Sequence, residues 1–287
     1  MSARPRCWGV YRELAHSPGR ETDDALILRA TAATLESRGF EVELKSPDEL
    51  PDSADASGVP PFLFVMCERV PTVERLAAWE RDGVRIVNRP DGIRNTDRER
   101  TIERFARHGV AFPKSVLVPT ALAAGTPEPG FPCWVKRGDV HATEEGDVSF
   151  AAGPAARDAA LALLSARGIA RAVVQEHVPG DLIKFYGVAG EQAGEPLSWF
   201  QWFYHRDQKL SNHPFDAVEL QALVARGASA LGLEVFGGDA IAGPGGELVL
   251  IDLNAWPSFA LYRDAASEKI AAFLAACFAK KEVGAPR

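Results

Sequence analysis

The sequence predicts a soluble α/β protein built from more than one lobe, and three observations support that prediction. The chain has 287 residues, which is enough for a large core and for more than one lobe. Its composition, 46% hydrophobic and 25% charged, is that of ordinary globular proteins. Before Pro90, strand-like segments alternate with helix-like segments, which is the pattern of a parallel α/β sheet.

The segments before Pro90 are identified by their periodicity and by their end signals. The run Phe62-Leu63-Phe64-Val65-Met66 is continuously apolar, as in a strand that is buried on both faces. A helix is expected to begin at Asp23 or Asp24 and to end before Gly39, because acids cap helix starts and glycine often follows helix ends. The expected strands are 7–11, 40–44, 62–66 and 85–87, and the expected helices are 23–38 and 73–82.

The pattern of expected elements changes after Pro90, where antiparallel strand pairs and longer loops are expected. The glycines from Gly243 to Gly246 join two apolar runs, which indicates a hairpin. The segments 182–189 and 197–204 are expected to form another antiparallel pair. The other expected strands are 115–118, 133–136, 148–150, 172–176, 236–241 and 248–254, and the expected helices are 96–108, 155–167, 218–231 and 265–278.

Charge and cysteine content limit the classes of partner. The net charge of −7 and the pI near 5.5 argue against a broad nucleic-acid surface, which would need to be basic. The four cysteines lie far apart, so neither a zinc motif nor a disulfide framework is indicated. The N-terminal residues lack the apolar stretch of a signal peptide, and no apolar run is long enough to span a membrane. We therefore expect a cytoplasmic protein without a nucleic-acid or membrane partner.

The hairpin carries the most informative polar residues of the chain. Asp239 lies on its first strand, and Asp252 and Asn254 lie on its second. Because Asp252 and Asn254 are two residues apart, they should point to the same face. Oxygen ligands on one face suit Mg²⁺, which is usually bound by one or two carboxylates together with substrate phosphates. The pattern therefore indicates a nucleotide-dependent enzyme.

Two lysines add a weaker signal for phosphate binding. Lys136 ends a short strand and precedes a polar loop with Gly138 and Gly146, where the backbone can approach phosphate oxygens closely. A solvated lysine before an ordinary turn is the competing interpretation. Lys184 stands among apolar strand residues and needs a partner, either a phosphate or an acid.

The turn from Gln175 to Asp181 follows a buried strand. Backbone groups freed at such a strand end can bind an adenine edge, and the Asp181 carboxylate can accept from ribose hydroxyls. A plain exit from the strand with solvated acids would look the same in sequence.

Taken together, these segments resemble the ATP-grasp superfamily. The resemblance covers roughly residues 94–278 and lies in the pieces Val135-Lys136, Val174-Gln175-Glu176-His177-Val178-Pro179-Gly180-Asp181, Lys184, Phe236-Gly237-Gly238-Asp239 and Ile251-Asp252-Leu253-Asn254-Ala255-Trp256-Pro257-Ser258. It implies an ATP-grasp fold, in which two α+β lobes hold ATP between them, preceded by a Rossmann-like parallel α/β domain. The implied boundaries are 1–92 for that first domain and 93–287 for the ATP-grasp domain, divided into a small lobe at 93–178 and a metal-binding lobe at 179–287.

The resemblance also implies residue roles. Lys136 would bind the α- and β-phosphates under the loop that contains Gly138, and Lys184 would approach the γ-phosphate. Asp239, Asp252 and Asn254 would hold two Mg²⁺ ions, with Mn²⁺ as an alternative. The adenine slot and the ribose site would be formed by Gln175, Glu176, His177, Val178 and Asp181.

Two positions depart from the family pattern. Arg98 stands where the family often has lysine, and it retains the ability to bind phosphate in a bidentate manner. Asp252 stands where the family often has the longer glutamate. His141, in the loop after Lys136, is either a phosphate-contacting residue or a solvated loop histidine.

Three functions follow from the resemblance. The layout is similar to ligases that add glutamate to a ribosomal protein, which implies phosphorylation of a small-molecule or peptide carboxylate and attack by an amine. Other pieces resemble the inositol trisphosphate kinase branch, and a non-catalytic nucleotide-binding protein is the third alternative. We favour the ligase, because the acidic chain offers only scattered arginines, such as Arg12, Arg20 and Arg69, to a polyphosphate. The substrate is expected near His16, Ser17, Arg20, His205, Arg206, Asn212 and His213, and a homodimer is compatible with the sequence.

Overall fold

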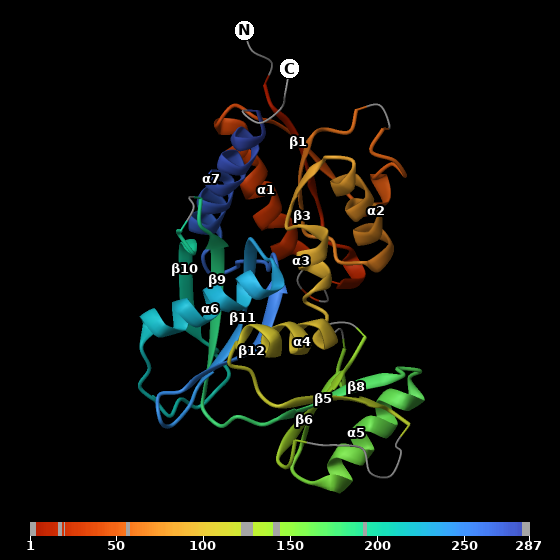
Figure 1. Cartoon of the computed structure of the whole chain (residues 1–287), viewed down its shortest axis with the longest axis vertical. Coiled ribbons are helices and arrows are strands. Elements are labelled where there is room, and N and C mark those ends of the chain that lie inside the picture. The colour runs from red at the N-terminus through yellow and green to blue at the C-terminus, as the bar shows by residue number, and fades with distance from the viewer. Residues whose placement is uncertain are drawn as a thin grey trace.

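Three four-stranded sheets organise the protein in the computed structural model (Figure 1), which describes residues 4–16, 19, 21–55, 58–121, 129–139, 144–191 and 194–282. The strand orders are β2-β1-β3-β4, β5-β8-β6-β7 and β10-β9-β11-β12. The expected positions of Ser17, Arg20 and His141 fall outside the described residues.

The first sheet is entirely parallel, which confirms the predicted Rossmann-like arrangement. All four residues of β3 are buried, as its continuous apolar sequence predicts. Helices α1 and α2 connect the strands in the alternating manner expected. The strands are β1 (Arg6–Val10), β2 (Glu41–Lys45), β3 (Phe62–Val65) and β4 (Arg85–Val87), and the helices are α1 (Glu21–Ser37) and α2 (Val70–Arg81), with single 3₁₀ turns at Leu14–His16 and Pro47–Glu49.

The second sheet forms a small lobe with α5 on one face. Its core includes Cys133 and Val135 from β6, Val174 from β8, and Leu161 and Leu164 from α5. Because side chains alternate along a strand, the even-numbered residues of β6 lie on the opposite face of the sheet. The elements are β5 (Ser115–Pro119), β6 (Cys133–Arg137), β7 (Val148–Ala151), α5 (Pro154–Ala166) and β8 (Arg171–Glu176).

The third sheet is antiparallel and contains both predicted strand pairs. Helix α6 packs against β12. It begins at the cap residue Asp216, whose side chain accepts a hydrogen bond from the Val218 amide, and it ends at Gly232 with φ of 76°. The elements are β9 (Asp181–Ala189), β10 (Leu197–Tyr204), α6 (Ala217–Leu231), β11 (Val235–Ala242), β12 (Leu248–Ala255) and α7 (Arg263–Glu282).

The helices α3 (Pro90–Arg94) and α4 (Arg98–His108) correct the predicted start of the small lobe. Helix α3 contacts α2 and β12, and α4 contacts α6. Phe105 of α4 belongs to the core of the large lobe, whereas the small-lobe core begins near Val116. The small lobe therefore starts near residue 115 and not at residue 93. The short helix α3 was not predicted.

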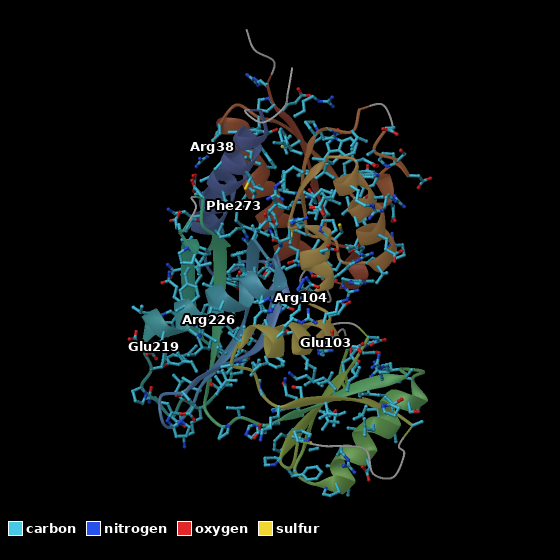
Figure 2. The ribbon with its side chains drawn as sticks, viewed as in Figure 1. Arg38, Glu103, Arg104, Glu219, Arg226 and Phe273 are labelled. Atoms are coloured by element: carbon cyan, nitrogen blue, oxygen red, sulfur yellow. The ribbon has the colours of Figure 1, made fainter. Side chains whose placement is uncertain are left out.

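The first domain and the large lobe share their hydrophobic cores. One core cluster contains Trp8 and Leu63 together with Phe236 and Leu250, although these residues come from different sheets. The other contains residues of β1, β3 and α1 together with residues of α7. Helix α7 lies beside α1 (Figure 1), and Phe273 of α7 is labelled among the side chains between these elements in Figure 2. These parts of the chain therefore form one packed body.

Asn88 adds a polar connection within this body. Its side chain is fully buried just after β4, and it reaches the start of β11. The Asn88 Oδ1 accepts from the amides of Glu234 and Val235, both at 2.8 Å, and its Nδ2 donates to the Val235 carbonyl at 2.7 Å. A buried carboxamide is tolerated here because these hydrogen bonds satisfy it.

Two further expectations concern cysteines and membrane spans. The four cysteines are free thiols, and burial raises the pKa of Cys7 to about 12, with Glu36 contributing. Such a thiol is inert as a nucleophile at neutral pH. Within the described part of the chain, none of the helices combines the length and the apolar character that a membrane crossing requires.

Candidate functional site

A row of polar side chains crosses three strands of the large lobe. Asp239 on β11 is paired with Lys184 on β9 and with Asp252 on β12. The Lys184 Nζ donates to Asp239 Oδ1 at 2.8 Å, and the Asn254 Nδ2 donates to Asp252 Oδ2 at 3.3 Å. This contact confirms that Asp252 and Asn254 share a face. The row therefore brings together four residues that lie up to 70 positions apart (254 − 184).

An irregularity in the hairpin sets the spacing of the two carboxylates. Asp239 is opposite Asp252, but Ala240 is opposite Leu250, so β12 carries one extra residue at this point. Gly238 precedes the irregularity, and a Cβ atom there would lie only 2.2 Å from the Asp252 carbonyl oxygen. Glycine is therefore required for the close approach of the strands beside the carboxylates.

The electrostatics of the row favour a bound cation. Burial raises the pKa of Asp239, the ion pair with Lys184 lowers it, and the nearby Asp252 raises it again. Two carboxylates and one carboxamide supply oxygen atoms on one face of the sheet. Among the residues described, no group of three His, Cys, Asp or Glu side chains is placed to hold a metal. The row therefore fits Mg²⁺ whose remaining ligands come from substrate phosphates and water, and it does not form an all-protein cage.

Lys136 and Arg98 approach the same carboxylates from other elements. Burial lowers the pKa of Lys136, whereas Asp252 and Asp239 raise it. Burial also lowers the pKa of Arg98, and Asp252 is the largest opposing influence. The Arg98 Nη1 donates to the Arg137 carbonyl at the end of β6. Two cations thus lie within electrostatic reach of Asp252, one from the small lobe and one from α4.

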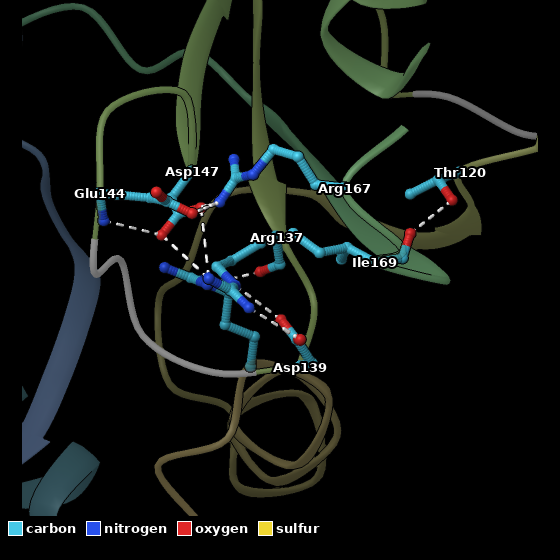
Figure 3. Close-up of polar contacts among 8 residues, drawn as sticks. Thr120, Arg137, Asp139, Glu144, Asp147, Arg167 and Ile169 are labelled. Atoms are coloured by element: carbon cyan, nitrogen blue, oxygen red, sulfur yellow. Dashed lines mark hydrogen bonds and ion pairs between the residues drawn. The ribbon is translucent and has the colours of Figure 1, made fainter. Parts of the chain in front are cut away.

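The loop after Lys136 is anchored by a buried ion network (Figure 3). The Asp147 side chain is fully buried, and it accepts from Arg137 Nη1 at 3.2 Å and from Arg167 Nη2 at 2.6 Å. It also accepts from the Glu144 amide at 3.1 Å. The ends of the loop are therefore fixed to β6 and to the end of α5.

The structure does not support the predicted role of the Gly138 backbone in phosphate binding. The Gly138 amide donates to the Arg171 carbonyl at 2.9 Å, so it continues the pairing of β6 with β8. A Cβ atom at Gly138 would lie 2.8 Å from that carbonyl oxygen. Glycine is needed here for strand packing.

The strand end after β8 differs in part from the prediction. The Gln175 side chain is only 3% exposed, and its Nε2 donates to Ser115 Oγ at 3.0 Å, so it does not face an open slot. Glu176, His177 and Val178 are partly exposed. The Trp134 Nε1 donates to His177 Nδ1 at 3.1 Å, and the rings of Trp134 and Phe150 pack edge to face. Trp134 lies two residues before Lys136 on β6, so this aromatic cluster lies on the Lys136 face of the small lobe.

Asp181 is the clearest departure from the expected site. Its side chain is buried, and its two carboxylate oxygens accept from the amides of Ser211 and His213 at 2.7 and 2.8 Å. Burial raises the pKa of Asp181, but these backbone hydrogen bonds outweigh it and lower the pKa below its usual value. Asp181 is therefore an anchor for the loop that contains Asn212, and it is not available to ribose hydroxyls.

A cavity of about 740 Å³ lies beside the polar row. Lys184, Asp239 and Asn254 line one part of it, and the first domain contributes another part through Arg12, Asp24 and Glu68. The expected substrate residues His16, His205 and Arg206 also line it. Asn212 and His213 are not among its lining residues and lie on the loop that Asp181 anchors.

Sequence reasoning missed the buried charges of this cavity and the aromatic cluster beside Lys136. Arg12 was noted only as a cation near a strand end, and its partners Asp24 and Glu68 were not identified. A local signal did exist for the aromatic cluster, since Val148 and Phe150 are apolar residues at strand spacing.

Comparison with known proteins gives a result at the level of structure and none at the level of sequence. No protein-family model matches the chain, and no curated protein sequence matches it. A RimK domain ATP-grasp protein from Sphaerobacter thermophilus DSM 20745 is 20% identical, with a TM-score of 0.69 over 94% of this chain and 99% of that one. D-alanine–D-alanine ligase from Bacillus anthracis in complex with ATP is 13% identical, with a TM-score of 0.71 over 99% of this chain and 100% of that one.

A third solved structure is the ATP-grasp ligase PsnB with its minimal precursor, Mg and ADP. It is 16% identical, with a TM-score of 0.64 over 95% of this chain and 98% of that one. All three cover the first domain as well as both lobes, and the polar row lies on the large-lobe sheet of the shared architecture. The chain therefore has the ATP-grasp fold, preceded by a Rossmann-like parallel domain.

Proposed function

We propose that the protein is an ATP-dependent carboxylate–amine ligase. In the proposed reaction, the γ-phosphate of ATP passes to a carboxylate of a small molecule or peptide, and an amine then attacks the acyl phosphate and releases phosphate. The observation that carries this proposal is the row of Lys184, Asp239, Asp252 and Asn254. Lys184, Asp239 and Asn254 line a cavity of about 740 Å³, and Asp252 has Lys136 and Arg98 within electrostatic reach.

The nucleotide is proposed to lie between the small lobe and the polar row. Lys136 would bind the phosphates as a point charge, and Arg98 would add a planar donor group. The partly exposed strand end at Glu176, His177 and Val178, next to the Trp134–Phe150 cluster, offers a planar apolar surface for adenine. Two fold neighbours were solved in complex with ATP, or with Mg and ADP, which supports a nucleotide as the ligand.

The proposed metal ligands are Asp239, Asp252 and Asn254. Bound Mg²⁺ would neutralise negative charge on the β- and γ-phosphate oxygens. The protein contributes the oxygen atoms, holds them in one row through the pairing of β11 with β12, and keeps Lys184 beside Asp239. Lys184 already forms an ion pair with Asp239. In the proposed complex, its ammonium group would therefore contact both Asp239 and the γ-phosphate.

The charges around the cavity favour the ligase over an inositol phosphate kinase. A polyphosphate needs a cluster of lysine and arginine side chains. The basic lining residues are Arg12, Lys184 and Arg206, with His16 and His205, whereas the acidic ones are Asp23, Asp24, Glu68, Asp207 and Asp239. Five carboxylates against three lysine and arginine side chains make the cavity unsuitable for a ligand with several phosphates, and suitable for a substrate with a cationic amine.

The test of the proposed function is phosphate release from Mg-ATP in the presence of pools of amino acids and short peptides. Asp252→Ala should lower turnover more than about 100-fold, because even residues that only support a metal ligand typically change activity by about 10–100-fold. Asp48→Ala is the control, since Asp48 is exposed and its ion pair among the described residues is with Arg69, away from the polar row. Both variants should keep the same circular dichroism spectrum.

Three outcomes would contradict the proposal. Phosphate that appears on a polyol, with none released, would favour the kinase. Unchanged turnover of the Asp252 variant would remove the metal assignment. Calorimetry that shows no Mg-dependent ATP binding by the unmodified protein would reject a nucleotide-dependent function altogether.

A further inference from the structure

Arg12 lines the cavity of about 740 Å³ beside the polar row. It follows β1, and its side chain is only 9% exposed. Arginine is rarely buried to this extent unless its donors are satisfied. A buried arginine beside a proposed carboxylate substrate would ordinarily be assigned to substrate binding, so the partners of its guanidinium group decide its role.

The guanidinium group of Arg12 contacts both the first domain and the large lobe. Its Nε lies 3.1 Å from Asp24 Oδ2 on α1, and its Nη1 pairs with Glu68, which follows β3. Its Nη2 donates to the carbonyl oxygens of Ala255 and Trp256, at 3.2 and 2.6 Å. These contacts give each of the three guanidinium nitrogens a partner within the chain, although the Nε contact with Asp24 is an ion pair without a hydrogen bond. The described partners of Arg12 are therefore acids and carbonyl groups of the protein itself.

The two carbonyl groups that Arg12 binds belong to the segment directly after the proposed metal ligand Asn254. The backbone there leaves the strand abruptly, because Trp256 has φ of 38° and Phe259 has φ of 51°. Non-glycine residues adopt such left-handed conformations only where their surroundings hold them. The Trp256 amide donates to the Val235 carbonyl at 2.9 Å, and the Arg12 hydrogen bonds hold the carbonyl side of the same turn.

We propose that Arg12 is a positioning residue for the metal-binding strand. By binding the carbonyls of residues 255 and 256, it fixes the end of β12 and so keeps the oxygen atoms of Asp252 and Asn254 in the arrangement that Mg²⁺ requires. Asp24 and Glu68 neutralise its charge and fix the plane of its guanidinium group, which links the first domain to the metal site. The proposal rests on the proposed function only in that Mg-ATP is taken as the ligand.

Lysine at this position tests the proposal without leaving the two acids unpaired. Arg12→Lys keeps a positive charge beside Asp24 and Glu68, but a single ammonium group cannot span two acids and two carbonyls at once. The matched control is Arg85→Lys. Arg85 also joins the first domain to the large lobe through an ion pair with Glu234, and it donates a hydrogen bond to the carbonyl of its neighbour Ile86. None of its described contacts reaches the segment directly after Asn254.

The measurement is calorimetric binding of ATP across a range of Mg²⁺ concentrations. In Arg12→Lys the Mg²⁺ concentration for half-maximal ATP binding should rise about 10–100-fold, which is the usual effect of removing support from metal ligands. In Arg85→Lys this concentration should stay within about twofold of that for the unmodified protein. Hydrogen exchange of the apo protein should be faster at residues 253–259 in Arg12→Lys only. A triple variant, Arg12→Met with Asp24→Asn and Glu68→Gln, removes all three charges and replaces the lysine variant if that variant is poorly folded. It should show the same rise of about 10–100-fold in the Mg²⁺ concentration for half-maximal binding.

The outcomes separate the two proposals. If the unmodified protein does not bind Mg-ATP, the proposed function fails. If it does bind, and the Arg12 variants bind with unchanged Mg²⁺ dependence and unchanged exchange at residues 253–259, then Arg12 is only a connection between domains and the positioning role is overturned. An equal shift in the Arg85 variant would overturn it as well, because the effect would then come from general loosening of the interface.

Discussion

At the residue scale, Lys136 carries the sharpest prediction. Burial lowers the pKa of Lys136, so its ammonium group holds its proton more tightly in the unfolded chain than in the folded protein. The apo protein is therefore destabilised by Lys136 at neutral pH, and this penalty disappears as pH rises through the folded and then the unfolded pKa. Lys136→Met should leave the apo protein equally or more stable at pH 7, and the stability difference should narrow towards alkaline pH in denaturant titrations.

The same variant should bind ATP more weakly. A hydrogen bond to a charged group contributes about 1.5–3 kcal/mol, so the loss of the ammonium group should weaken ATP binding by at least about tenfold. Calorimetry measures this directly. Lys114→Met is a suitable control lysine, because Lys114 lies just before β5 and its described contact to Glu176 is made by its backbone carbonyl. If both lysine variants lose affinity equally, Lys136 has no special role.

The placement of individual residues was predicted well where local spacing determines geometry, and poorly where partners lie far away in sequence. The shared face of Asp252 and Asn254 follows from the period of a strand, and the structure confirms it. Asp181 looked like a solvated acid in a turn, but its carboxylate accepts from amides about 30 residues later. Arg12 contacts carbonyl groups more than 240 residues away in sequence, and no local sequence pattern predicts such a contact.

At the element scale, Asp147 is expected to stabilise the folded conformation of the loop after β6. Asp147→Ala should reduce the free energy of unfolding by about 3 kcal/mol, because it leaves Arg137 and Arg167 without their fully buried partner. Asp139→Ala is the control, since the Asp139 side chain is 49% exposed and also pairs with Arg137. Exposed pairs contribute at most about 1 kcal/mol.

The measurement for Asp147 combines chemical unfolding with limited proteolysis of the folded protein. Cleavage between β6 and β7 should accelerate in the Asp147 variant and remain unchanged in the Asp139 variant. Equal destabilisation by both substitutions would mean that the network acts through net charge and not through the buried carboxylate.

The expected strands all occur, with ends that shift by at most one residue, because apolar runs and turn residues mark them clearly. Helix α3 was missed because it is short and contains both Pro90 and Gly92. The packing of the chain explains the glycine, since a Cβ atom at Gly92 would lie 2.4 Å from the Gly232 carbonyl oxygen. That contact joins segments 140 positions apart (232 − 92), so only the folded structure reveals it.

At the scale of the whole molecule, the distribution of core residues predicts two units of stability. The small lobe has its own core, whereas the first domain and the large lobe share theirs. Leu164→Ala and Leu250→Ala each remove a side chain that is no more than 1% exposed, and each should cost about 2–5 kcal/mol.

Hydrogen exchange distinguishes the two substitutions. Leu164→Ala should accelerate exchange in β5 to β8 and α5 only, and Leu250→Ala should accelerate it in the first domain and the large lobe together. Uniform acceleration by Leu164→Ala would show that all three sheets unfold as one unit.

The overall architecture was predicted by two kinds of information. Alternating periodicities indicated the parallel first domain, and the resemblance to ATP-grasp proteins indicated the two lobes that the fold comparison supports. The small-lobe boundary was misplaced because α4 precedes that lobe in sequence but packs on α6. Sequence order alone does not show which body a connecting helix joins.

The packing of α7 on the first domain has a consequence for synthesis of the chain. Phe278 stacks on Phe62 of β3 with ring centroids 4.5 Å apart, and Ile270, Phe273 and Leu274 belong to the same core cluster as β1, β3 and α1. A domain that emerges first from the ribosome ordinarily folds first. Here the first sheet lacks one of its covering helices until residue 278 has been translated, so this domain can complete its core only after both lobes have been synthesised.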